Sequence, residues 1–128
     1  MKLLGIDTGT RRVGLALGDT ESKLAMPWKT LKGLEEESLV TELARLISEE
    51  GIEAVVVGEP ITLAGERGAA AARSRAFARD LIKHTGALPI HFIDERLSSK
   101  LADRIRELYG DRDATAAAVV LQTYLDKL

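Results

Sequence analysis

The sequence predicts an α/β domain with a five-stranded mixed sheet whose first three strands are antiparallel, flanked by helices. Three observations carry this prediction. The first quarter of the chain consists of short apolar runs separated by turn residues, as in antiparallel hairpins. The run Ala54–Val57 is apolar without interruption, which is typical of a strand buried on both faces. Later strands alternate with segments of helical periodicity, and such crossovers make strands parallel.

The N-terminal region is expected to supply the antiparallel strands. Gly9 and the polar residues around it predict a turn, so 2–18 should form a hairpin. Pro27 favours an edge position for the third strand, because proline cannot donate a hydrogen bond to a neighbouring strand. The expected strands here lie at 2–7, at 13–17 and within 24–32.

Helices are expected to alternate with strands in the rest of the chain, with a loop at 58–68. Gly51 should end the first helix, and Ser98 or Ser99 should cap the third. The expected elements are helices at 35–50, at about 68–84, from the cap at Ser98 or Ser99 onward and at 113–127, and strands at 54–57 and 90–93. Apolar spacing predicts the inward-facing residues. They are Leu39, Leu43, Leu46 and Ile47; Ala70, Ser74, Phe77, Leu81 and Ile82; Leu97, Leu101, Ile105 and Leu108; and Ala117, Val120, Leu121, Tyr124, Leu125 and Leu128.

Length and composition indicate the class of protein. The 128 residues fit a single domain over 1–128, and 45% hydrophobic residues suffice for an ordinary core. No apolar stretch is long enough to span a bilayer, and the N-terminus does not read as a signal peptide. The absence of cysteine excludes disulfides and thiolate zinc sites. We therefore expect a cytoplasmic protein without a membrane partner.

Charge is distributed unevenly along the chain. The net charge of −2 argues against a basic nucleic-acid binder as a whole, yet residues 64–112 carry 10 basic and 7 acidic side chains. Most of these basic residues are arginines, which suit bidentate contact with phosphate. A solvated helix surface is the alternative, and charge alone favours it.

Carboxylates stand at three junctions between elements. Asp7 ends the first strand, Asp94 and Glu95 end the fifth, and Asp113 opens the last helix. Asp113 precedes Ala117 by four residues, so it belongs to the face that the helix buries. Acids directed at a core are costly unless they are paired or bind a cation. Together they predict one site for Mg²⁺ or Mn²⁺, with two ions about 3.5–4 Å apart that promote phosphodiester hydrolysis.

Each acid also has a structural interpretation. Asp7 could be a turn residue, and Asp113 could be a helix cap in competition with Asp111. Strand alternation allows only one of Asp94 and Glu95 to enter the site directly, and a salt bridge with Arg96 could hold the other. The two histidines, His84 and His91, stand at a helix end and within a strand, which gives little support to a nucleophilic triad.

Three blocks of residues form a further pattern along nearly the whole chain. The first is Gly5-x-Asp7-x-Gly9-x-x-Arg12-x-Gly14-x-Ala16, and the second is Asp94-Glu95-Arg96-Leu97-Ser98-Ser99. The last is Asp113-x-x-Ala116-Ala117-x-x-Val120-Leu121-Gln122-x-Tyr124-Leu125. Gly58-x-Pro60, Gly65, Gly68 and Phe77 lie between the first two blocks. In this order and at this spacing, the blocks resemble the YqgF family, also called the RuvX family.

The resemblance implies a ribonuclease H-like fold and a metal-dependent nuclease that acts on nucleic acid. The family is described as maturing pre-16S ribosomal RNA and as similar to Holliday-junction resolvases. By position, its catalytic and metal-binding acids fall on Asp7, Glu95 and Asp113. Arg12 and Arg96 match its arginines and are expected to contact phosphate. Ser99, where the family favours threonine, and Arg73 complete the expected substrate contacts.

Two departures from the family pattern stand out. Glu59 takes a position that is usually apolar, where it either adds negative charge near the site or faces solvent. The segment 110–112 is shorter and less basic than the corresponding connection of the family. Phosphate contacts supply much of nonspecific nucleic-acid binding, so this segment predicts weaker substrate affinity unless arginines elsewhere, such as Arg73, compensate.

Two other functions compete with a nuclease. Residues 5–10 resemble the phosphate-binding hairpin of sugar kinases and actin-like ATPases, but those enzymes enclose ATP between two domains and this chain offers one. A non-catalytic nucleic-acid or ribosome-assembly module agrees with the acidic pI of about 5.7. The sequence does not choose between RNA and DNA. A twofold-symmetric junction substrate would favour a homodimer.

Overall fold

A mixed five-stranded sheet forms the centre of the computed structural model, which describes residues 1–9, 11–59, 68–94, 107 and 112–128. The strands are β1 (Lys2–Thr8), β2 (Arg12–Asp19), β3 (Leu24–Lys32), β4 (Ala54–Glu59) and β5 (Ile90–Asp94), in the order β3-β2-β1-β4-β5. β1, β2 and β3 are antiparallel, while β4 and β5 run parallel to β1 and to each other. The predicted sheet and its directions are therefore confirmed.

β3 is an edge strand, as Pro27 predicted. The register shifts between Leu15, which pairs with Lys29, and Ala16, which pairs with Pro27. Trp28 is the extra residue of this bulge, and such bulges bend an edge strand and increase its twist. β4 extends to Glu59, so the loop expected from residue 58 begins later, and its residues 60–67 lie outside the described chain.

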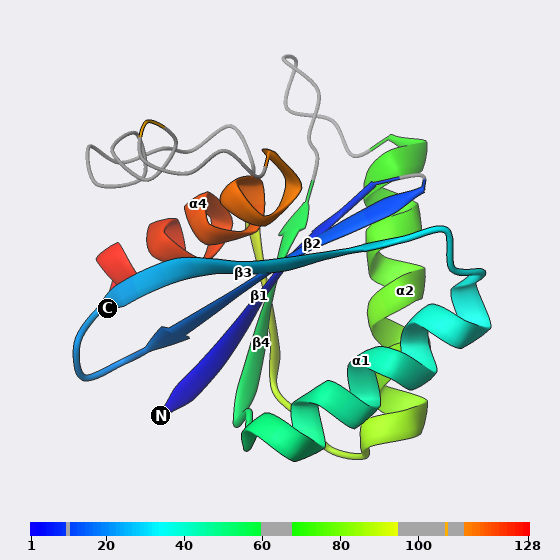
Figure 1. Ribbon diagram of the computed structural model, residues 1–128, viewed down its shortest axis with the longest axis horizontal. Helices are drawn as coiled ribbons and strands as arrows, with labels where there is room; N and C mark the ends of the chain where they lie inside the picture. The colour runs from blue at the N-terminus through cyan, green and yellow to red at the C-terminus, as the bar shows by residue number, and fades with distance from the viewer. Residues whose placement is uncertain (10, 60–67, 95–106, 108–111) are drawn as a thin grey trace.

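Two layers of helix cover the sheet (Figure 1). α1 (Glu36–Glu50) and α2 (Ala69–Thr85) pack on one face, and α4 (Arg112–Asp126) packs on the other. Gly51 ends α1 in the left-handed conformation with φ of 66°, as its sequence position predicted. The helix and apolar stripe expected over 97–108 lie outside the described residues, apart from Glu107.

Alternation along β1 divides the core between the two faces. Leu4 and Ile6 belong to the cluster under α1 and α2, whereas Leu3 belongs to the cluster under α4. Most residues that were expected to face inward are buried, but two predictions are wrong. Ile82 is 39% exposed because α2 buries Ala78 and Leu81 instead, and Leu128 is 54% exposed because it lies beyond the end of α4. Ala70 is half-buried, and Ala71 is buried.

α4 lies unusually close to the sheet. A Cβ atom on Gly5 would come within 2.8 Å of Leu121 Cβ, and one on Gly18 would come equally close to Leu121 Cδ2. Glycine on the strands and the small residues Ala117 and Ala118 on the helix therefore set the separation of the two layers. This close contact carries the beginning of α4 down onto the carboxyl end of β1.

Gln122 fastens α4 to the edge strand. Its side chain is fully buried, accepts a hydrogen bond from the Ala25 N–H at 2.9 Å and donates to the Lys23 carbonyl at 2.8 Å. We expect Gln122→Leu to lower the free energy of unfolding by about 2–4 kcal/mol, because it leaves backbone groups of β3 without these partners. Thr123→Val is the control, since that buried hydroxyl donates to the Val119 carbonyl within the same helix. Equal melting temperatures of the two variants would contradict this role.

Candidate active site

Asp7 lies on the face of the sheet that α4 covers. A side chain on Gly5 would meet Leu121 of α4, and residues two apart on a strand share a face. Thr8 faces the other side, where its hydroxyl lies 2.9 Å from that of Ser74 in α2. The last two residues of β1, Asp7 and Thr8, therefore face opposite sides of the sheet.

Asp113 reaches the same place from α4. Gly14 of β2 pairs with Asp7 in the sheet, and a Cβ atom on Gly14 would come within 1.8 Å of the Asp113 carbonyl oxygen. Directly opposed residues of antiparallel strands have Cα atoms about 4.5–5.5 Å apart. The first turn of α4 thus rests on the residue beside Asp7. Of the three predicted acids, the structure places these two, from opposite ends of the chain, beside Gly14 on one face of the sheet.

Arg12 stands at the rim of this site. Its guanidinium lies 3.8 Å from the Asp113 carboxylate, and its side chain is 60% exposed while that of Asp113 is 25% exposed. An exposed ion pair of this length contributes little to stability. The arginine is therefore accessible to phosphate while it stays close to the acids.

Glu95, Arg96 and Ser99 lie outside the described residues. Within the described part of the chain, no three groups of the metal-binding types form a cluster. Asp7 and Asp113 nonetheless offer oxygen donors of the kind that Mg²⁺ and Mn²⁺ prefer, so the donor chemistry fits such an ion. Asp94 shares its strand face with Phe92, whose ring packs on the α1 and α2 side, so Asp94 faces away from Asp7.

Glu59 does not face solvent, and that alternative is wrong. Only 2% of the residue is exposed, and its carboxylate accepts a hydrogen bond from Arg75 Nε at 2.5 Å. The Arg75 guanidinium also lies 3.8 Å from the centre of the Phe92 ring. These contacts place Glu59 on the α2 side of the sheet with a neutralising partner, on the face opposite Asp7. The sequence alone gave no sign of Arg75 as this partner.

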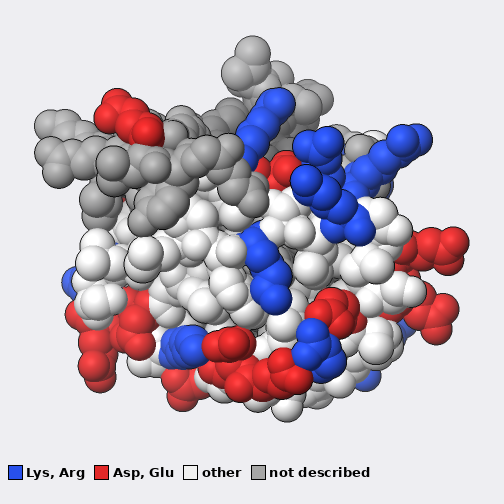
Figure 2. Space-filling model, viewed as in Figure 1, with Lys and Arg blue, Asp and Glu red and all other residues white. Residues whose placement is uncertain are grey.

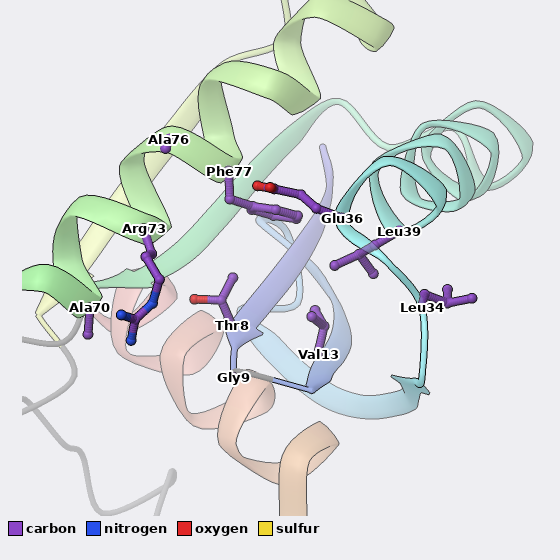
Figure 3. Close-up of a pocket in the computed structure, with 10 residues that line it drawn as sticks. All are labelled: Thr8, Gly9, Val13, Leu34, Glu36, Leu39, Ala70, Arg73, Ala76 and Phe77. Atoms are coloured by element: carbon purple, nitrogen blue, oxygen red, sulfur yellow. The ribbon is translucent and has the colours of Figure 1, made fainter.

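Arg73 lines a cavity of about 550 Å³ that the sequence did not predict. The cavity lies on the α2 side of the hairpin between β1 and β2, and Figure 3 shows side chains from both α1 and α2 around it. Arg73 thus belongs to the opposite face of the sheet from Asp7, although both lie near the carboxyl end of β1. The cavity is formed by segments that are distant in the sequence, so no local sequence pattern predicts it.

A group of basic side chains lies at one end of the molecule. Figure 2 shows this group in the upper right, where Figure 1 places the β1–β2 hairpin and the beginning of α2, while the lower edge carries acidic and basic side chains together. Arg11, Arg12 and Arg73 are exposed in this region. A local excess of positive charge raises the concentration of polyanions there, even on an acidic protein.

Comparison with solved structures identifies the class of fold. The structure is similar to RuvC from Thermus thermophilus, with a TM-score of 0.69, 16% identity and coverage of 99% of this chain and 95% of that one. It is also similar to the Holliday junction resolvase of fowlpox virus, with a TM-score of 0.59, 13% identity and full coverage of both chains. The predicted ribonuclease H-like fold, in the form that RuvC has, is confirmed.

Sequence comparison identifies the family. The family model "RuvX: Holliday junction resolvase" matches residues 1–127, and the chain belongs to the RuvX family. A relative from Chloroflexus aggregans is 36% identical and covers 97% of this chain and 92% of its own length. Another from Anaeromyxobacter is 40% identical and covers 98% and 97%. Both bear the name "Putative pre-16S rRNA nuclease". Among the described residues, no helix is long and apolar enough to cross a membrane.

Proposed function

We propose that this chain is a divalent-metal-dependent nuclease that hydrolyses phosphodiester bonds in structured nucleic acid during maturation of pre-16S ribosomal RNA. The observation that supports this most is that the first turn of α4, which carries Asp113, packs on Gly14, the residue paired with Asp7 in the sheet. Two half-buried carboxylates from opposite ends of the chain lie at the carboxyl end of the central strand with Arg12 beside them, an arrangement that suits a bound cation and a phosphate. Membership of the RuvX family and the names of its relatives agree with the proposal.

Asp7, Glu95 and Asp113 would hold Mg²⁺ or Mn²⁺, in the proposal as two ions. A bound divalent cation supplies positive charge against the charge that develops on the phosphate during hydrolysis. The acids position that charge at the carboxyl end of β1. The exposed guanidinium of Arg12 would bind a phosphate beside the cleaved one and orient the backbone. Arg96 and Ser99 would contribute further contacts to the substrate.

A cleavage panel tests the proposal. The substrates are a four-way DNA junction, single strands and a precursor of 16S ribosomal RNA, each incubated with Mg²⁺, with Mn²⁺ or with EDTA. We expect cleavage of the structured substrates with either metal and none with EDTA. RNA binding that is unaffected by metal, without cleavage of any substrate, would instead support a non-catalytic assembly module. Tight ATP binding in calorimetry without nuclease activity would support the kinase-like alternative.

A further inference from the structure

The cavity beside the β1–β2 hairpin is lined by apolar side chains together with a few polar ones. Apolar side chains line most of it, including Val13, Leu39 and the ring of Phe77. Its volume of about 550 Å³ lies within the range of roughly 300–1,000 Å³ that is usual for small-molecule sites. A space of this size and character suits a flat, largely apolar group such as a nucleobase.

Polar groups stand at the two ends of the cavity. Arg73 points toward Thr8 at one end, and Glu36 extends toward Phe77 at the other (Figure 3). The Thr8 and Ser74 hydroxyls lie 2.9 Å apart and either can donate, while the Ser74 hydroxyl also lies 3.3 Å from the Ala70 carbonyl. When Ser74 donates to Ala70, Thr8 donates to Ser74. The lone pairs of the Thr8 oxygen then remain able to accept a hydrogen bond from a ligand. One end of the cavity therefore offers a cation, and both ends offer acceptors.

We propose that this cavity binds one unpaired nucleotide of the nucleic-acid substrate. The base would enter between Val13, Leu39 and Phe77, and the guanidinium of Arg73 would bind its phosphate. The Glu36 carboxylate would accept from the amino or imino groups of the base. Its negative charge would keep the phosphate at the opposite end, next to Arg73.

The position of the cavity connects it to the cleavage site. Asp7 and Thr8 are consecutive in β1 and face opposite sides of the sheet, so the cavity and the acids share one strand end. A nucleotide held there would fix the path of its strand across the hairpin toward the acids. The inference rests on the proposed function and adds a feature of its substrate, an unpaired nucleotide near the cleaved bond.

Fluorescence anisotropy in EDTA tests the inference, because binding is then measured without cleavage. The probes are two labelled RNA hairpins that differ only by one bulged nucleotide in the stem. We expect the parent protein to bind the bulged hairpin about tenfold more tightly than the paired one, the scale of one stacked base. Ala76→Leu, which fills the cavity, should reduce this preference to within about twofold and leave affinity for the paired hairpin unchanged.

Ala72→Leu is the matched control, since Ala72 is exposed on the same helix and does not line the cavity. It should keep the full preference. Ala70→Leu, six residues or about one and two-thirds turns before Ala76, fills the cavity from another side should Ala76→Leu fail to fold. Retention of the preference in a folded cavity-filling variant, or its absence in the parent, would overturn the inference. If the cavity-filling variant loses the preference but the parent protein cleaves no substrate of the panel, the nucleotide site would be supported and the nuclease function rejected.

Discussion

Replacement of Asp7 by asparagine is expected to lower the rate of metal-dependent cleavage by roughly a thousandfold or more. The change removes a negative oxygen donor at the point where Asp113 approaches Gly14, and it preserves side-chain shape. Asp7 is the second-last residue of β1 and is half-buried, so the fold should persist. Initial rates on the best substrate of the panel, with circular dichroism melting in parallel, measure both effects.

Asp94→Asn is the matched control for Asp7→Asn. Asp94 also ends a strand of the same sheet, but it shares a face with Phe92 rather than with α4. We expect this variant to cleave within about threefold of the parent rate, because a group on the other face does not touch the reacting phosphate. Equal cleavage by Asp7→Asn and the parent would reject the assignment of the site.

Gly14→Ala is expected to disrupt both the fold and the site. Its added methyl group would come within 1.8 Å of the Asp113 carbonyl oxygen, which belongs to the backbone and cannot rotate away. The first turn of α4 would have to move off the sheet to remove this steric clash. We expect a loss of about 3 kcal/mol or more in unfolding free energy, which lowers the melting temperature by about 10 °C. Cleavage should fall even well below that temperature, because Asp113 moves with the helix.

Gly68→Ala separates this effect from the general cost of replacing a glycine. No atom of the described residues lies within 4 Å of a Cβ placed on Gly68, and its φ of −90° is open to other residues. Its loss of stability should stay below about 1 kcal/mol. If thermal melts gave the two glycine variants the same stability, the close approach of α4 to β2 would be contradicted.

Local patterns predicted much of this fold. Period-two and period-3.6 spacing located five strands and three helices, and Gly51 and Pro27 marked a helix end and an edge strand. The sequence also indicated that Asp113 would lie on the same side of the sheet as Asp7. Asp113 lies four residues before Ala117, so a buried helix face had to carry it toward the sheet.

Long-range contacts limited what the sequence could predict. The burial of Glu59 depends on Arg75, which lies on another element, and no local spacing selects that partner. The cavity depends on how α1 and α2 pack beside the hairpin. α2 buries Ala71 and Ala78 in place of Ala70 and Ile82, because the neighbouring strand decides which part of a wide apolar face is covered.

Anomalous diffraction from crystals grown with Mn²⁺ would locate the proposed metal site. We expect a manganese peak bound by carboxylate oxygens of both Asp7 and Asp113, with Glu95 as a third ligand, at about 2.0–2.2 Å. The Asp7→Asn variant under the same conditions should show that peak weakened or lost. Manganese bound elsewhere, with the carboxylates of Asp7 and Asp113 too far apart to share an ion, would contradict the proposed site.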